Sequence, residues 1–102
     1  MDVNVYLTSL IGHIYKLVPL REELGGWSNT DFIAYIESLL IEVYGSLATF
    51  PELGQCAGYI GVVNTLQYMK THEMSEKVCR REVFKAIRGL DYTIRKVGGQ
   101  NV

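Results

Sequence analysis

The chain has 102 residues, a length typical of one domain, and its ten lysines and arginines against eleven aspartates and glutamates give a formal net charge of −1. Its 48% hydrophobic and 21% charged residues exclude a disordered chain, because such chains lack the apolar surface that offsets ordering entropy. The charge balance is also unlike that of dedicated nucleic-acid-binding modules, which are strongly basic. We therefore expect a single folded domain over residues 1–102.

No stretch of the sequence predicts a membrane span. The longest run without a charged residue, residues 53–69, is shorter than the roughly 20 apolar residues that a span needs, and it contains Asn64 and two glutamines. A secretory signal would require a basic stretch before its apolar run, and none precedes the first apolar run here. Two cysteines form no disulfide framework. We expect an intracellular, cytoplasmic protein without a membrane partner.

Hydrophobic residues recur at intervals of three and four in four segments, the spacing that places them on one face of an α-helix. The first segment predicts a helix over residues 3–18. Its apolar face consists of Val3, Leu7, Leu10, Ile14 and Leu17. Pro19 should end or kink this helix, because proline disfavours helical geometry in the residue before it.

The second segment predicts a helix over residues 29–49. Ser28 with Asp31 resembles a capping box, and Trp27 with Phe32 has the spacing of a hydrophobic staple. The predicted apolar face consists of Phe32, Ile36, Leu39, Val43, Leu47 and Phe50.

The third segment predicts a helix over residues 52–72, with Thr49 and Glu52 as its capping pair and Pro51 in its first turn. Three glycines lower its helix propensity by about 1 kcal/mol each relative to alanine, so residues 57–63 could instead form a short buried strand. As a helix, the segment would present Gly54, Gly58 and the pair Ala57 and Gly61 on a smooth side where a neighbouring backbone can approach closely.

The fourth segment predicts a helix over residues 76–97, which begins after Ser75. Four helices joined by short links are typical of an all-α, up-down four-helix bundle. The mean hydropathy is slightly positive, at +0.09. A small helical domain of this composition leaves apolar surface uncovered as a monomer, so we expect a homodimer or larger oligomer.

The fourth helix also carries a marked charge asymmetry. Residues 77–96 contain seven of the ten basic residues and two acids, which gives a charge of +5 against −6 for the remainder. On a helix that advances about 100° per residue, Val83, Ile87 and Leu90 face the core and the basic residues gather on the opposite side. The predicted binding residues are Lys77, Arg81, Lys85, Arg88, Tyr92, Arg95 and Lys96.

Three uses of these residues are consistent with the sequence. They could be solvated or paired with the protein's own acids, dock on an acidic protein partner, or bind nucleic-acid phosphates while Tyr92 stacks on a base. We expect docking on an acidic partner, and nucleic-acid binding through the same residues is the alternative.

No motif predicts catalysis, a metal site or a cofactor. His13, Cys56, His72 and Cys79 lack the close spacing of structural zinc sites. The inward Glu-x-x-His pairs of diiron bundles are missing, as are phosphate-binding glycine loops and nucleophile motifs. The sequence therefore predicts a small non-enzymatic interaction or regulatory protein with no cofactor and no metal.

Overall fold

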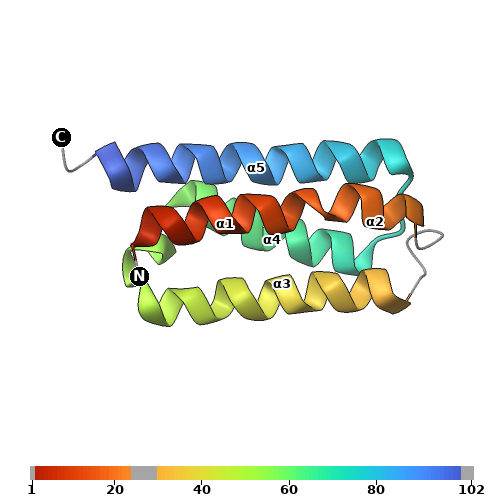
Figure 1. The fold of residues 1–102 in the computed structure, drawn as a ribbon, viewed down its shortest axis with the longest axis horizontal. Helices are drawn as coiled ribbons and strands as arrows, with labels where there is room; N and C mark the ends of the chain where they lie inside the picture. Colours follow the sequence, from red (N-terminus) through yellow and green to blue (C-terminus); the bar gives the residue numbers. More distant parts are fainter. Residues whose placement is uncertain (1, 24–29, 100–102) are drawn as a thin grey trace.

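The computed structural model describes residues 2–23 and 30–99. These residues form the predicted all-α, up-down four-helix bundle (Figure 1). The first rod consists of α1 (Val3–Tyr15) and α2 (Leu17–Glu23), and the second is α3 (Thr30–Thr49). The third consists of the short 3-10 helix η1 (Pro51–Gln55) and α4 (Ala57–Thr71), and the fourth is α5 (Glu76–Gly99).

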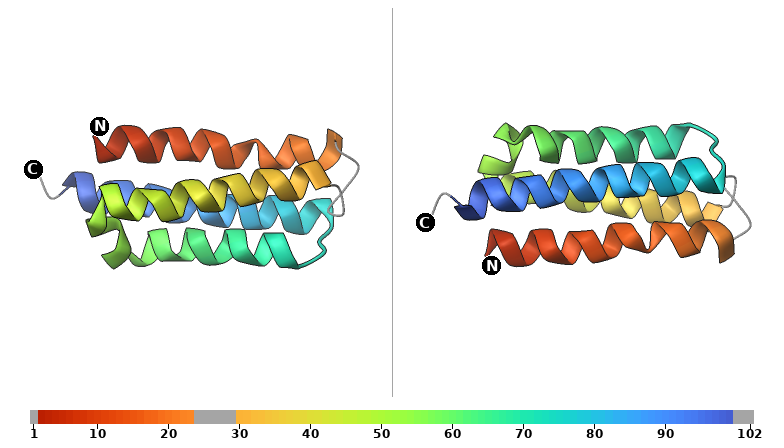
Figure 2. Two further views of the ribbon diagram at one scale, coloured as in Figure 1. Left: turned by 90° about the horizontal axis from the view of Figure 1, so that it is seen from below. Right: turned by 90° about the horizontal axis from the view of Figure 1, so that it is seen from above.

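Helices α3 and α5 lie diagonally across the bundle from each other. Helix α5 packs against α4 on one side and against α1 and α2 on the other, and α3 packs against α4 and α2. Figure 2 shows the same order, with α3 in front of α5 from one side and behind it from the other. The outward faces of α3 and α5 therefore point in opposite directions.

The core is built from one apolar face of each rod, as the spacing of the hydrophobic residues predicts. Leu10, Phe32, Leu66 and Leu90, one from each rod, are completely buried. Burying such a side chain contributes roughly 1.5–3 kcal/mol relative to leaving it exposed, so this shared core is the main source of the bundle's stability.

The first helix is interrupted three residues earlier than Pro19, at Lys16. Proline lacks the amide hydrogen that would bond to the carbonyl of Tyr15, and its ring would clash with that carbonyl in a continuous helix. The helix resumes at once, because the amide of Leu20 donates to the carbonyl oxygen of Lys16 at 3.1 Å. Proline thus causes a break in a rod that runs on to Glu23 rather than ending it near residue 18.

The third rod differs from the single helix predicted over residues 52–72. Cys56 adopts an extended conformation (φ −97°, ψ 113°) and separates η1 from α4. The predicted pairing of Thr49 with Glu52 is wrong, since Phe50 precedes η1 and makes no side-chain capping bond. Residues 57–63 are helical, so the strand alternative is also wrong.

The C-terminal end of α3 at Thr49 and the start of α5 at Glu76 agree with the prediction. Helix α3 is described from Thr30, and the predicted cap and staple residues Ser28 and Trp27 lie outside the described residues. At the start of α5 the hydroxyl of Ser75 accepts a hydrogen bond from the amide of Val78 at 3.2 Å. Such a bond satisfies one of the free amides of the first helical turn.

Helices α4 and α5 touch through their backbones at Gly58 and Gly89. A Cβ atom added to Gly58 would lie 2.6 Å from the carbonyl oxygen of Gly89, and one added to Gly89 would lie 2.8 Å from that of Gly58. The predicted close approach is therefore confirmed at Gly58. It does not extend to Gly54, which belongs to η1, or to Gly61, which is exposed with nothing within 4 Å of an added Cβ.

The core also contains a small hydroxyl cluster where α1, α3 and α4 meet. The hydroxyl of Tyr59 is 3.0 Å from that of Tyr6 and forms a short hydrogen bond with that of Ser46. Ser46 in turn donates to the carbonyl oxygen of Val43 at 2.7 Å. Burial raises the pKa of Tyr59 and of Tyr6, because a phenolate would lose its hydration there. The cluster therefore stays protonated and serves to link three helices.

Helix α2 is tied to the turn between α4 and α5. The Nη2 atom of Arg21 donates to the carbonyl oxygen of Met74 at 3.0 Å. Nearby, Arg80 of α5 forms an ion pair with Glu22 at 3.4 Å. These contacts hold together the end of the bundle at which α5 begins.

Candidate interaction surfaces

The seven binding residues predicted on α5 all lie exposed along its outward side. We call Lys77, Arg81, Lys85, Arg88, Arg95 and Lys96, together with Tyr92, the basic ridge. From Lys77 to Lys96 it extends roughly 28 Å at the helical rise of 1.5 Å per residue. Tyr92 is 58% exposed and stands among the cations. The structure thus keeps the predicted residues together on one face.

Glu82 is the carboxylate that contacts this ridge. Its side chain is 9% exposed, with one oxygen 3.5 Å from Nε of Arg81 and the other 3.9 Å from Nζ of Lys85. Both distances are long for a hydrogen bond, and both cations are well exposed, so solvent screens the cationic side of these pairs. Arg81 and Lys85 therefore remain able to meet an external anion.

The remaining cations of the ridge are less restricted. Lys77, Arg88, Arg95 and Lys96 make no ion pair with any part of the chain that the structure describes. Arg80, which the helical wheel places beside the apolar stripe, instead faces α2 and pairs with Glu22. The acids that the structure describes thus neutralise little of the ridge, although the chain as a whole carries more acids than bases.

A shallow hollow borders the basic ridge on the side of α4. It has a volume of about 360 Å³ and lies where the missing side chain of Gly61 leaves space beside Asn64 and Thr65. Arg81 and Lys85 line its other side, with Glu82 between them. The hollow extends the cationic surface from α5 toward α4.

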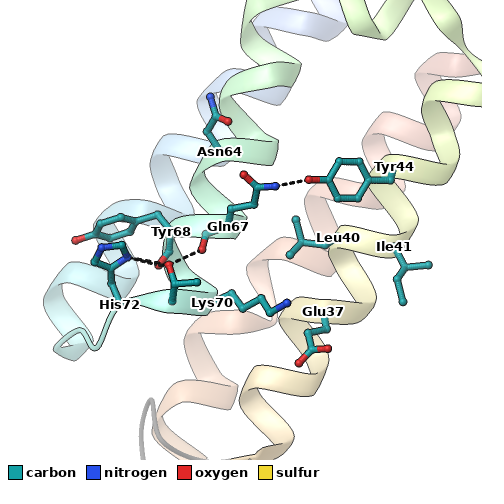
Figure 3. A pocket seen from close by; sticks show the side chains of 10 residues that line it. Glu37, Leu40, Ile41, Tyr44, Asn64, Gln67, Tyr68, Lys70 and His72 are labelled. Carbon is teal, nitrogen blue, oxygen red and sulfur yellow. Dashed lines mark hydrogen bonds between the residues drawn. The ribbon is translucent and has the colours of Figure 1, made fainter.

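A larger groove lies between α3 and α4, and the sequence did not predict it. Its volume is about 770 Å³, and Leu40 lies on the side of α3 that faces α4 (Figure 3). At one end the side-chain amide of Gln67 donates to the hydroxyl of Tyr44 and bridges the two helices. At the other end Lys70 reaches from α4 toward α3, near Glu37 (Figure 3).

The rim of this groove exposes large apolar side chains. Ile41 is 74% exposed and projects outward from α3, and the rings of Tyr44 and Tyr68 are also exposed. The signal for this surface is present in the sequence, because α3 carries Leu40, Ile41 and Tyr44 in addition to its core stripe. A helix whose apolar residues extend beyond one stripe has more than one apolar face to cover.

Helix α3 is also the one helix, among the described residues, that is long and apolar enough to cross a membrane by length and composition alone. Within the bundle its Phe32, Ile36 and Val43 are completely buried against the other rods. Its apolar character therefore has two sources, the buried core stripe and the exposed rim of the groove.

The histidines and cysteines considered as a zinc set occupy separate places. His13 of α1 contacts Glu42 of α3 at 3.2 Å, and the ring of His72 stacks on Tyr68 with 4.1 Å between centroids. Within the described residues, no group of three or more histidine, cysteine and acidic side chains is placed to hold a metal ion. Cys56 and Cys79 are free and buried, and burial raises the pKa of the Cys79 thiol to about 11.

No family model matches the chain, and no match was found among curated proteins or solved structures. The geometry and charge of the two surfaces are therefore the features that bear on function.

Proposed function

We propose that the protein is a small non-enzymatic interaction protein that docks on an acidic protein surface through the basic ridge. The proposal is based on the unneutralised charge of the basic ridge. Four of its six cations have no ion pair among the described residues. Clustered like charges on a rigid helix raise the rate of encounter with a surface of opposite sign and orient the partner.

The rigidity of α5 supports the same conclusion. Its apolar face is held by the core, with Val83 and Leu90 completely buried, so the backbone that carries the cations does not have to fold during binding. A preorganised surface loses less conformational entropy on association than a disordered basic tail. Arginines also form bidentate hydrogen bonds with carboxylates, which adds geometric specificity to the charge.

Binding of nucleic acid is the alternative use of the ridge, and the exposed ring of Tyr92 is the observation that favours it. A base stacked on an aromatic side chain gains roughly 1–3 kcal/mol. The net charge of −1 argues against it, because the acids elsewhere on the chain repel an extended polyanion.

The test compares two charge reversals of equal size on exposed residues. Arg88→Glu lies in the basic ridge and Lys16→Glu lies outside it, and each changes the net charge by two units. Binding to poly-L-glutamate and to single-stranded DNA is measured by fluorescence anisotropy over a series of salt concentrations. We expect Arg88→Glu to weaken binding to poly-L-glutamate roughly tenfold and Lys16→Glu to change it little.

Three results would contradict the proposal. One is equal loss of binding in the two variants, which would indicate a general charge effect. Another is the absence of binding to poly-L-glutamate at low salt. The third is binding to DNA that is much tighter than binding to poly-L-glutamate and depends steeply on salt. If that salt dependence were smaller in Arg88→Glu, the ridge would be assigned to nucleic acid.

A further inference from the structure

We infer that the groove between α3 and α4 is the interface of a homodimer, in which Ile41 of each copy packs into the groove of the other. The inference concerns a different surface from the basic ridge and does not depend on the proposed function, although the groove adjoins the hollow beside the ridge at Asn64 and Tyr68. The inference is based on the volume of the groove, on the exposed apolar side chains at its rim and on the two charged residues that line it.

The groove and Ile41 form a self-complementary pair of shapes. Ile41 is the most exposed large hydrophobic side chain among the described residues. Its neighbours on the outward side of α3 are Ser38, which has a short side chain, and Gly45, which has none, and both are exposed, so a second helix can approach Ile41 closely. A two-fold axis brings the same patch of each copy together, so one patch must supply both a projection and a recess.

The charges that line the groove are compatible with a second copy as its occupant. Glu37 and Lys70 are exposed at the same end of the groove, and neither forms an ion pair with a described residue. Because one charge of each sign leaves this face without a net charge, two copies of it do not repel each other. In contrast, two copies of the basic ridge would repel each other.

The apolar rim supplies the driving force for association. Ile41, Tyr44 and Tyr68 expose apolar surface around one recess, and a second copy that covers them would remove this surface from water. Large apolar and aromatic side chains at the centre of an interface contribute most of its binding energy. The structure thus combines a central anchor, a recess and a balanced polar edge on one face.

The inference is tested with the variants Ile41→Glu and Val5→Glu. Val5 of α1 is 59% exposed and lies outside the groove, so its variant adds the same charge to a different face. Sedimentation velocity and light scattering should give a wild-type mass of twice the 11.5 kDa chain. Ile41→Glu should raise the dimer dissociation constant roughly 30-fold or more, and Val5→Glu should leave it unchanged. Far-UV circular dichroism verifies that both variants remain folded.

Cross-linking provides a second readout. Cys56 and Cys79 are buried, so a cysteine placed at Ile41 is the accessible thiol. A short bis-maleimide should link Ile41→Cys chains into dimers and leave Val5→Cys chains as single chains.

A wild-type chain that stays monomeric up to about 1 mM would overturn the inference. A dimer that survives Ile41→Glu would also overturn it. A dimer that is lost in Arg88→Glu would place the interface on the basic ridge instead. Binding of a monomeric wild-type chain to phosphatidylcholine vesicles that is lost in Ile41→Glu would assign the face to a membrane.

Discussion

The contact between Gly58 and Gly89 gives the sharpest prediction about stability. Gly58→Ala would place a Cβ atom 2.6 Å from the backbone oxygen of Gly89 and 2.8 Å from the hydroxyl oxygen of Thr93. A backbone atom cannot rotate away, so α4 and α5 must separate along their shared surface. Overpacking of this kind costs about 1–3 kcal/mol or more, and the higher helix propensity of alanine returns up to about 1 kcal/mol. We expect a net loss of roughly 1–2 kcal/mol.

Gly61→Ala is the matched control, because it makes the same change in the same helix at a position where nothing lies within 4 Å of the added Cβ. We expect it to stabilise the protein by about 0.5–1 kcal/mol. Urea unfolding followed by far-UV circular dichroism gives both free energies of unfolding, and equal slopes confirm that the unfolded states are comparable.

The double substitution of Gly58 and Gly89 by alanine sharpens the test. Both alanines would push the same two helices apart, so we expect the double variant to lose less stability than the two single variants added together. If the Gly58→Ala variant had the same free energy of unfolding as the Gly61→Ala variant, the close approach of the two backbones would be refuted.

Three further predictions follow from contacts elsewhere in the bundle. Burial raises the pKa of Tyr59 above its ordinary value of 10.0, so above that pH the unfolded state binds fewer protons than the folded state and stability falls. In Tyr59→Phe the loss of melting temperature between about pH 8 and pH 11 should be smaller, and an unchanged loss would exclude Tyr59 as a cause. Arg21→Ala removes the hydrogen bond to the Met74 carbonyl and should lower the free energy of unfolding by about 1.5–3 kcal/mol, with a near-zero effect arguing that water replaces the bond. Glu82→Gln removes the carboxylate between Arg81 and Lys85 and, on the proposed function, should tighten binding to poly-L-glutamate by a factor of about two to five. Weaker binding would show instead that Glu82 holds the two cations in place.

The helical periodicity predicted the fold class because each rod must bury one apolar stripe. Residues at intervals of three and four share a face whatever the other helices do, so Leu10, Phe32 and Leu90 could be assigned to the core in advance. The sequence predicted an interruption by Pro19 but not its position at Lys16, and it did not predict the extended Cys56. Proline and glycine both disfavour a helix, and packing against the other rods can override that preference. Helix propensity alone therefore does not fix where a helix breaks.

The two surfaces differ in how far the sequence reveals them. The basic ridge belongs to one helix, so the positions of its cations around α5 follow from the helical repeat. The groove is made by two helices, and its depth depends on how α3 and α4 approach each other. Residues such as Tyr44 and Gln67 are 23 positions apart in the chain, and only the packed bundle brings them into contact.

The sequence by itself thus determined the all-α class, the inward stripe of each helix and the outward cationic side of α5, because these are properties of single helices. The tertiary structure decided which helices are neighbours, where the glycines let two backbones meet, and that α3 and α5 face opposite ways. The physical reason is that side-chain direction around a helix is set locally by backbone geometry. Grooves and crossings arise from the mutual packing of helices that are distant in the chain.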